Sequence, residues 1–334
     1  MSIVGISISL LPVLLFLTGL ILLDSFKLVR FRPLLFSLLY GAVVAVIAYQ
    51  LNTFLLDRFS ISLTPFSRYA APGIEETLKA GFIVLLIKQN RVGFAVDAAI
   101  HGFAVGAGFA VIENIYYLAT APEAGMYVWG IRGLGTAIMH GGATTVFALV
   151  LKNLADRDVQ IRASRLGLSL FAAFCLHSLY NHFILPPLVG TSVLLVVFPA
   201  IIMGLFNESE KRMRSWLGSG FDTDQELLGL ILSGQLSSTR VGTYLHDLKG
   251  HFDGTVIVDM LCLIRIRVEL SIRAKGLIMM REAGFQAPVD PLTKSKFEEL
   301  AYLEDNIGRT GLAAIEPIHR WNRKELWQLH VLKQ

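Results

Sequence analysis

The sequence has little cysteine: only Cys175 and Cys262 occur in 334 residues. Cys175 falls in an apolar run and Cys262 in a more polar stretch near the C-terminus, so we expect no disulfide between them. Neither cysteine has a second cysteine or a histidine at the spacing of a redox motif or a zinc ribbon. This pattern argues against a disulfide framework, thiol chemistry and a structural zinc site.

The sequence also lacks a strong net charge and a basic leader. Its formal charge is +4, and most basic residues fall in short loops. Basic residues in short loops are typical of a membrane protein with several spans and not of a nucleic-acid-binding surface. No basic segment precedes the first apolar run, residues 3–23, which is too long for the core of a signal peptide. We therefore expect a retained first membrane span and no nucleic-acid partner.

Apolar residues are abundant instead. They make up 54% of the sequence, and the mean hydropathy is +0.57, whereas soluble proteins average roughly 45–50%. The long apolar runs lie almost entirely in residues 1–206, and residues 207–334 resemble an ordinary soluble sequence. The predicted fold is all-α: a polytopic membrane helix bundle over 1–206, and a small helical soluble domain over 207–334.

About seven segments are long enough to cross a bilayer. The predicted spans are 3–23, 33–56, 71–87, 94–118, 133–151, 166–185 and 188–206. Basic residues concentrate after the first, third, fifth and seventh spans, which places the N-terminus outside and the C-terminal domain in the cytoplasm. Charged residues interrupt the apolar run at 255–270, so no eighth span is expected. The C-terminal domain is either a regulatory module or a passive appendage.

Ionisable residues inside these spans are the strongest functional signal. Glu75 and Glu76 are adjacent in the third span, although a carboxylate in hydrocarbon costs at least a few kcal/mol. Further polar residues occur in the next three spans: Glu113, His140, His177 and Asn181. Counting 1.5 Å per residue places all of them within roughly 6–12 Å of the outer boundary. Four helices are thus predicted to bring polar groups to one level.

These residue types support the activation of water for hydrolysis. Catalytic zinc sites are built from histidine and glutamate ligands and keep one coordination position open for water. A further glutamate can accept the proton of that water. A metal-free site, in which a glutamate held by a histidine activates water directly, is equally compatible with the sequence. Lys79 lies one helical turn from both Glu75 and Glu76 and can neutralise either one.

Other interpretations remain open at this level. A glutamate paired with Lys79 can be a buried ion pair that fixes helix packing, and His140 and His177 can be packing residues. Carboxylates and histidines at one depth also suit a transporter that binds an ion or relays protons. A non-catalytic membrane scaffold is the third alternative.

Four motifs resemble those of the PrsW family of intramembrane proteases. Glu75-Glu76-Thr-Leu-Lys79 resembles its EExxK motif, and the segment from Phe109 to Glu113-Asn114 resembles FxxxE(N). Arg132 with His140 is similar to the third motif, and the segment from His177 to Asn181 to the fourth, HxxxN/D. The motifs stand in order on separate spans and cover about residues 70–185.

The resemblance implies a peptidase that cleaves a membrane-anchored protein, such as an anti-sigma factor, near the extracytoplasmic side of the bacterial inner membrane. Our leading hypothesis makes Glu75 or Glu76 the base and Asn181 the group that orients the substrate or oxyanion. The metal, with zinc as the candidate, would be held by Glu113, His140 and His177. The expected partners are the protein substrate and the lipid bilayer.

Overall fold

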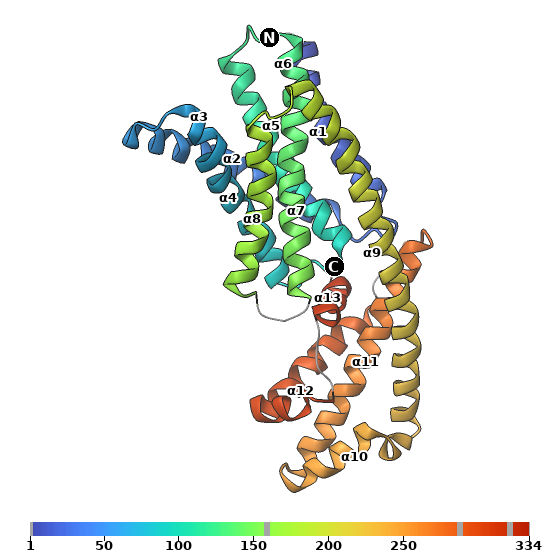
Figure 1. Cartoon of the computed structure of the whole chain (residues 1–334). Coiled ribbons are helices and arrows are strands. Elements are labelled where there is room, and N and C mark those ends of the chain that lie inside the picture. Colours follow the sequence, from blue (N-terminus) through green and yellow to red (C-terminus); the bar gives the residue numbers. More distant parts are fainter. Residues whose placement is uncertain (1–2, 157–160, 286–289, 319–322, 334) are drawn as a thin grey trace. The chain divides into compact units, whose positions relative to one another are not determined.

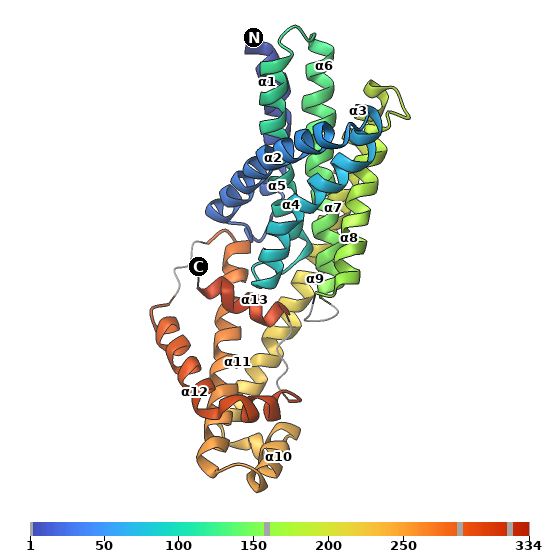
Figure 2. The same cartoon turned by 90° about the vertical axis from the view of Figure 1, so that its left-hand side faces the viewer.

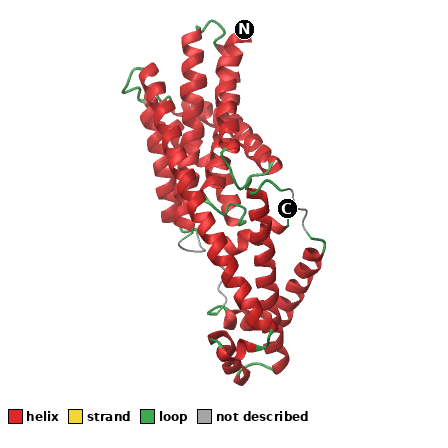
Figure 3. Cartoon of the chain, turned by 90° about the vertical axis from the view of Figure 1, so that its right-hand side faces the viewer, coloured by secondary structure: helices red, strands yellow, loops and turns green. Residues whose placement is uncertain are grey.

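The computed structural model describes residues 3–156, 161–285, 290–318 and 323–333. Every regular element in these ranges is a helix (Figure 3), which confirms the prediction of an all-α protein. The chain divides into two compact units, residues 1–210 and 211–334, and the division falls inside one long helix. Each unit is described by itself.

The first unit contains the helices that form the candidate site. Its elements are α1 (Ile3–Leu22), α2 (Phe31–Phe59), α3 (Leu63–Pro65), the π-helix η1 (Phe66–Ala70), α4 (Ala71–Lys88), α5 (Ala95–Thr120), α6 (Met126–Gly130), the π-helix η2 (Ile131–Thr136), α7 (Ala137–Ala155), α8 (Ala163–Asn181) and the beginning of α9 (Pro187–Leu232).

The second unit contains the rest of α9 and a group of shorter helices. They are η3 (Gln235–Ser238), α10 (Arg240–Asp247), η4 (Leu248–Gly250), α11 (Gly254–Glu282), α12 (Leu292–Ile315) and α13 (Arg323–Leu332). The apolar face of α11 packs against α12 and α13. Arg267 of α11 donates to Glu304 of α12 at 2.9 Å.

By length and composition, 5 helical segments of the described residues qualify as membrane spans. They are α1, α2, α5, α9 and the continuous segment Met126–Ala155. The other two predicted spans correspond to α4 and α8. Helix α4 carries Glu75, Glu76, Lys79 and Lys88, and α8 carries polar residues that include His177. The count of seven spans therefore stays a prediction, because the polar residues of the candidate site lower the hydropathy of these two helices.

Helix α5 forms the centre of the first unit. It is packed on several sides, by α7, α2 and α1 (Figures 1 and 2), and all residues from Val96 to Ala110 are buried. Small residues allow this close approach. A Cβ atom on Gly106 would lie 2.3 Å from the carbonyl oxygen of His140, and one on Gly102 would lie 2.8 Å from that of Thr144. The close contact between α5 and α7 fixes the backbone of His140.

Candidate active site

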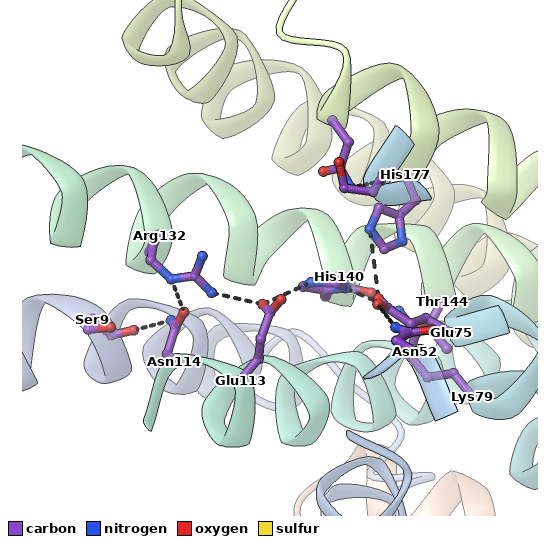
Figure 4. A network of polar contacts seen from close by, with 12 residues as sticks. Ser9, Asn52, Glu75, Lys79, Glu113, Asn114, Arg132, His140, Thr144 and His177 are labelled. Atoms are coloured by element: carbon purple, nitrogen blue, oxygen red, sulfur yellow. Dashed lines mark hydrogen bonds and ion pairs between the residues drawn. The ribbon is translucent and has the colours of Figure 1, made fainter. Parts of the chain in front are cut away.

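Ionisable side chains from four helices meet in one buried cluster within the first unit. Glu75, Glu76 and Lys79 come from α4 and Glu113 from α5. His140 of α7 and His177 of α8 complete the cluster. Figure 4 shows Glu75, His140 and His177 close together, with Glu113 on the other side of His140. The structure thus brings together residues up to 102 positions apart, from Glu75 to His177.

One ion pair of this cluster is buried. The Lys79 side chain is 0% exposed, and its ammonium nitrogen lies 2.5 Å from Oε1 of Glu76. The same oxygen lies 2.8 Å from Nδ1 of His177. The sequence left open which glutamate Lys79 neutralises, and the structure pairs it with Glu76. Glu75 is therefore the α4 carboxylate that has no lysine partner among the described contacts.

The hydrogen-bond partners fix the tautomer of His177. A carboxylate only accepts hydrogen bonds, so Nδ1 of His177 carries the proton that it donates to Glu76. In the neutral imidazole, Nε2 then keeps a lone pair, and this nitrogen lies 3.9 Å from Oε2 of Glu75. Because this lone pair lies beside a second carboxylate oxygen, His177 is ready to act as a metal ligand or as a proton acceptor.

His140 is held from both ring nitrogens. Its Nδ1 lies 3.2 Å from the ammonium nitrogen of Lys79, and its Nε2 lies 3.2 Å from Oε2 of Glu113. The ammonium group can only donate, so Nδ1 accepts and Nε2 donates its proton to Glu113. The rings of His140 and His177 meet edge to face, with centroids 4.7 Å apart.

Glu113 is the most accessible carboxylate of the cluster. Its side chain is 26% exposed, against 11% for Glu75 and 2% for Glu76. Arg132 donates to Oε2 of Glu113 at 3.0 Å and to Asn114 at 3.0 Å, as Figure 4 shows. In the described part of the chain, no hydrogen bond or ion pair reaches Oε1 of Glu113. This oxygen therefore remains available to water or a ligand.

Two π-helical turns lead into the site. The first, η1, directly precedes α4, and the second, η2, precedes α7 and contains Arg132. Such turns widen a helix by one residue, and they occur frequently at functional sites. The Arg132 guanidinium also lies over the ring of Tyr117, 3.7 Å from its centroid. The irregular backbone of η2 thus carries Arg132, whose side chain is held by Glu113, Asn114 and Tyr117.

One group of side chains has the composition of a metal site. Ligand atoms of Glu75, His140 and His177 all lie within 4.8 Å of one another, and the three residues are buried. The Oε2 atoms of Glu75 and Glu76 are also buried and have no hydrogen-bond partner among the described residues. Unpaired buried carboxylate oxygens require a cation or a donor. The residues present therefore fit a bound divalent metal such as zinc.

This group differs from the predicted metal ligands in one residue. The sequence suggested Glu113 with His140 and His177, but the described cluster places Glu75 with the two histidines. Glu113 instead contacts Arg132 and His140. The depth estimate placed Glu75 and Glu113 at the same level, so depth alone did not distinguish them as ligands.

Asn181 forms a hydrogen bond with a residue that is far from it in the sequence. Its side-chain amide donates to the backbone carbonyl of Ser67 in η1 at 2.9 Å. The described contacts do not join it to the cluster, whereas the sequence suggested that it orients the substrate. Two other histidines of the first unit have partners outside the cluster. His101 contacts Ser37, and His182 contacts Tyr69.

Sequence reasoning missed Asn52 of α2. Its side-chain nitrogen donates to Oε1 of Glu75 at 3.2 Å (Figure 4), and its Oδ1 is buried without a partner among the described residues. An amide inside an apolar span was the available signal, since polar side chains in such spans are costly and tend to be paired. Helix α2 thus contacts the cluster in addition to α4, α5, α7 and α8.

Comparison with known proteins agrees with the motifs. The sequence model of one family, described as PrsW family intramembrane metalloprotease, matches residues 30–205. This range is more than half of the 334 residues and includes the whole cluster together with Asn52. No curated protein and no solved structure is similar enough to the chain to count as a match. The chain belongs to the PrsW family of intramembrane metalloproteases, which are peptidases that contain membrane-spanning helices.

Proposed function

We propose that the buried cluster is the active site and that it hydrolyses a peptide bond of a membrane-anchored protein. The observation that carries this proposal is the pair of buried carboxylate oxygens, Oε2 of Glu75 and Oε2 of Glu76, that accept no hydrogen bond from the described residues. A purely structural ion-pair cluster would be expected to satisfy these buried oxygens, since each one left unpaired costs roughly 1–3 kcal/mol. The unpaired oxygens therefore favour a site that a ligand completes.

Glu75, His140 and His177 are the proposed metal ligands. A zinc ion bound there would supply a Lewis acid that polarises the scissile carbonyl and the attacking water. Nε2 of His177 already has its lone pair beside Glu75. His140 has both ring nitrogens engaged, so it must release either Lys79 or Glu113 to become a ligand. The other residues of the cluster hold these three in place.

Glu113 is the proposed general base. Its Oε2 is fixed by Arg132 and His140, and its accessible Oε1 can accept the proton of the attacking water. This assignment exchanges the roles of Glu75 and Glu113 in the hypothesis from sequence. Arg132 acts as a positioning residue, because its contacts with Asn114 and Tyr117 hold the guanidinium against Glu113.

Glu76, Lys79 and Asn181 are proposed to position the other groups. Glu76 orients His177 through the bond to Nδ1, and Lys79 balances its charge. Asn181 holds the η1 backbone just before α4. This placement supports the geometry of α4 and replaces the substrate-orienting role suggested by the motif.

The proposal includes the topology and the substrate. Seven spans, with α4 and α8 among them, place the N-terminus outside and leave the site in the outer half of the bacterial inner membrane. The first domain, 1–206, is then the protease, and 207–334 is a soluble cytoplasmic helical domain. A single-span protein with an extracytoplasmic segment, such as an anti-sigma factor, is the substrate class that reaches this side.

Cleavage by the purified protein tests the activity. The full chain and a fluorogenic single-span reporter protein are reconstituted together in liposomes, and zinc is added. We expect cleavage by the wild type and loss of at least 100-fold in His177→Ala, because His177 contacts both α4 glutamates. His182→Ala is the matched control, since this histidine lies in the next turn and contacts Tyr69. Cleavage retained in His177→Ala contradicts the site, and ion flux without cleavage supports a transporter instead.

Replacement of Asn52 tests the support of Glu75. Asn52→Leu removes the donor to Oε1 of Glu75. We expect zinc affinity to fall about 10–100-fold, which is the usual effect of removing a residue that hydrogen-bonds a metal ligand. Competition with a chromogenic chelator measures this affinity. Gln50→Leu is the control, because Gln50 is an exposed amide on the same helix. Unchanged zinc affinity in Asn52→Leu would show that Asn52 does not position Glu75.

A further inference from the structure

A cavity of the first unit lies between α2 and α4, away from the candidate active site. Its volume is about 440 Å³, and its walls are mainly apolar. The lining residues come from the beginning of α2 and from the end of α4 and the segment that follows it. Asn52 and Glu75 lie toward the opposite ends of these helices, so the groove and the active-site cluster belong to different membrane leaflets in the proposed topology.

Two arginines border this groove. Arg32 lies in the first turn of α2, and Arg91 follows α4. Both side chains are exposed, and within the described ranges neither guanidinium has a hydrogen bond or an ion pair. The backbone N–H of Arg91 donates to the carbonyl of Leu86 at 2.9 Å, which fixes this residue at the edge of the groove. Two uncompensated positive charges thus converge on one apolar cavity.

The walls of the groove suit a hydrocarbon chain. Phe36, Leu39 and Val43 line it from α2 and are 63%, 52% and 58% exposed. Phe82 lines it from α4 and stacks on Tyr40, with ring centroids 5.1 Å apart. The Tyr40 hydroxyl donates to the carbonyl of Leu78 at 2.9 Å and joins the two helices there. The groove therefore has an apolar wall beside its cationic edge.

We propose that this groove binds one anionic phospholipid. The phosphate would lie between Arg32 and Arg91, because guanidinium groups bind phosphate through paired hydrogen bonds. The positive end of the α2 dipole adds to this attraction. One acyl chain would follow Leu39, Val43 and Phe82. In the proposed topology the arginines face the cytoplasmic leaflet, where anionic lipids attract basic residues.

Lipid binding to the purified full chain tests the proposal. Native mass spectrometry in detergent compares phosphatidylglycerol with phosphatidylcholine of the same acyl chains. We expect one phosphatidylglycerol to bind with clear preference. The double variant Arg32→Gln/Arg91→Gln should bind it roughly 30-fold more weakly, from about 1 kcal/mol for each basic residue. Arg58→Gln, an exposed arginine at the other end of α2, should leave binding unchanged.

A second variant separates the groove from general surface charge. Leu39→Trp keeps both arginines but fills the cavity, and it should also abolish the preference for phosphatidylglycerol. Size-exclusion chromatography and thermal unfolding confirm that each variant is folded. The proposal fails if the wild type shows no preference or if both groove variants bind as the wild type does. Equal binding of soluble glycerol phosphate also overturns it, because the apolar wall would then contribute nothing.

Discussion

Glu75→Gln is expected to lose zinc, whereas Glu113→Gln is expected to keep zinc and lose cleavage. Glu75 shares the buried ligand group with His140 and His177, while Glu113 does not belong to it. Replacing a ligand should reduce zinc affinity by more than the 10–100-fold that follows when a residue hydrogen-bonded to a ligand is lost. Replacing a general base should reduce the cleavage rate about 10²–10⁴-fold.

The measurement is zinc content by elemental analysis together with cleavage of the single-span reporter. Glu123→Gln provides a control, since this glutamate is exposed in the loop after α5. It should retain both zinc and activity. If Glu113→Gln loses zinc and Glu75→Gln keeps it, the ligand set suggested by the sequence is right and the assignment from the structure is wrong. If neither variant changes zinc content, no metal is held by these glutamates.

Lys79→Met is expected to cause the largest loss of stability. The substitution preserves an unbranched side chain but leaves the Glu76 carboxylate, which is 2% exposed, without its cationic partner. Breaking a buried ion pair by removing one partner costs about 3–5 kcal/mol of unfolding free energy. Denaturant unfolding in detergent micelles measures this difference. Lys88→Met is the matched control, because Lys88 is an exposed lysine at the end of the same helix.

The double variant Lys79→Met/Glu76→Gln separates charge from packing. If the cost comes from an uncompensated carboxylate, removing that charge should restore part of the lost stability, and the two substitutions will be non-additive. Additive losses would show that Lys79 acts through its packing, including its position 4.6 Å from the centre of the Phe109 ring.

Local sequence patterns predicted most of the helices and drew attention to the residues of the candidate site. Apolar runs and charged loops predicted helices close to α1, α2 and α5, because helix formation in a membrane depends on segment length and hydropathy. The last predicted span, 188–206, covers only the beginning of α9, which continues to Leu232. The unfavourable position of carboxylates in apolar runs indicated Glu75, Glu76 and Glu113. Helical repeat and span direction predicted that these residues lie at one level with His140 and His177. In the structure these five side chains are linked by direct contacts and through Lys79.

The pairing of these residues needed the tertiary structure. Lys79 is within helical reach of both α4 glutamates, and only the position of α8 brings His177 to the oxygen that Lys79 already contacts. The partnership of Asn52 with Glu75 depends in the same way on how α2 crosses α4. Helical periodicity fixes the depth and face of a side chain within its own helix, but it contains no information about a second helix.

The sequence by itself therefore indicated an all-helical membrane protein of the PrsW family and predicted that its ionisable residues lie at one depth. Only the tertiary structure decided that Lys79 neutralises Glu76, that Glu75 joins the two histidines and that Arg132 holds Glu113. The physical reason is distance. Hydrogen bonds and ion pairs act over about 3 Å, and such separations between side chains of different helices are set by packing that no local pattern specifies.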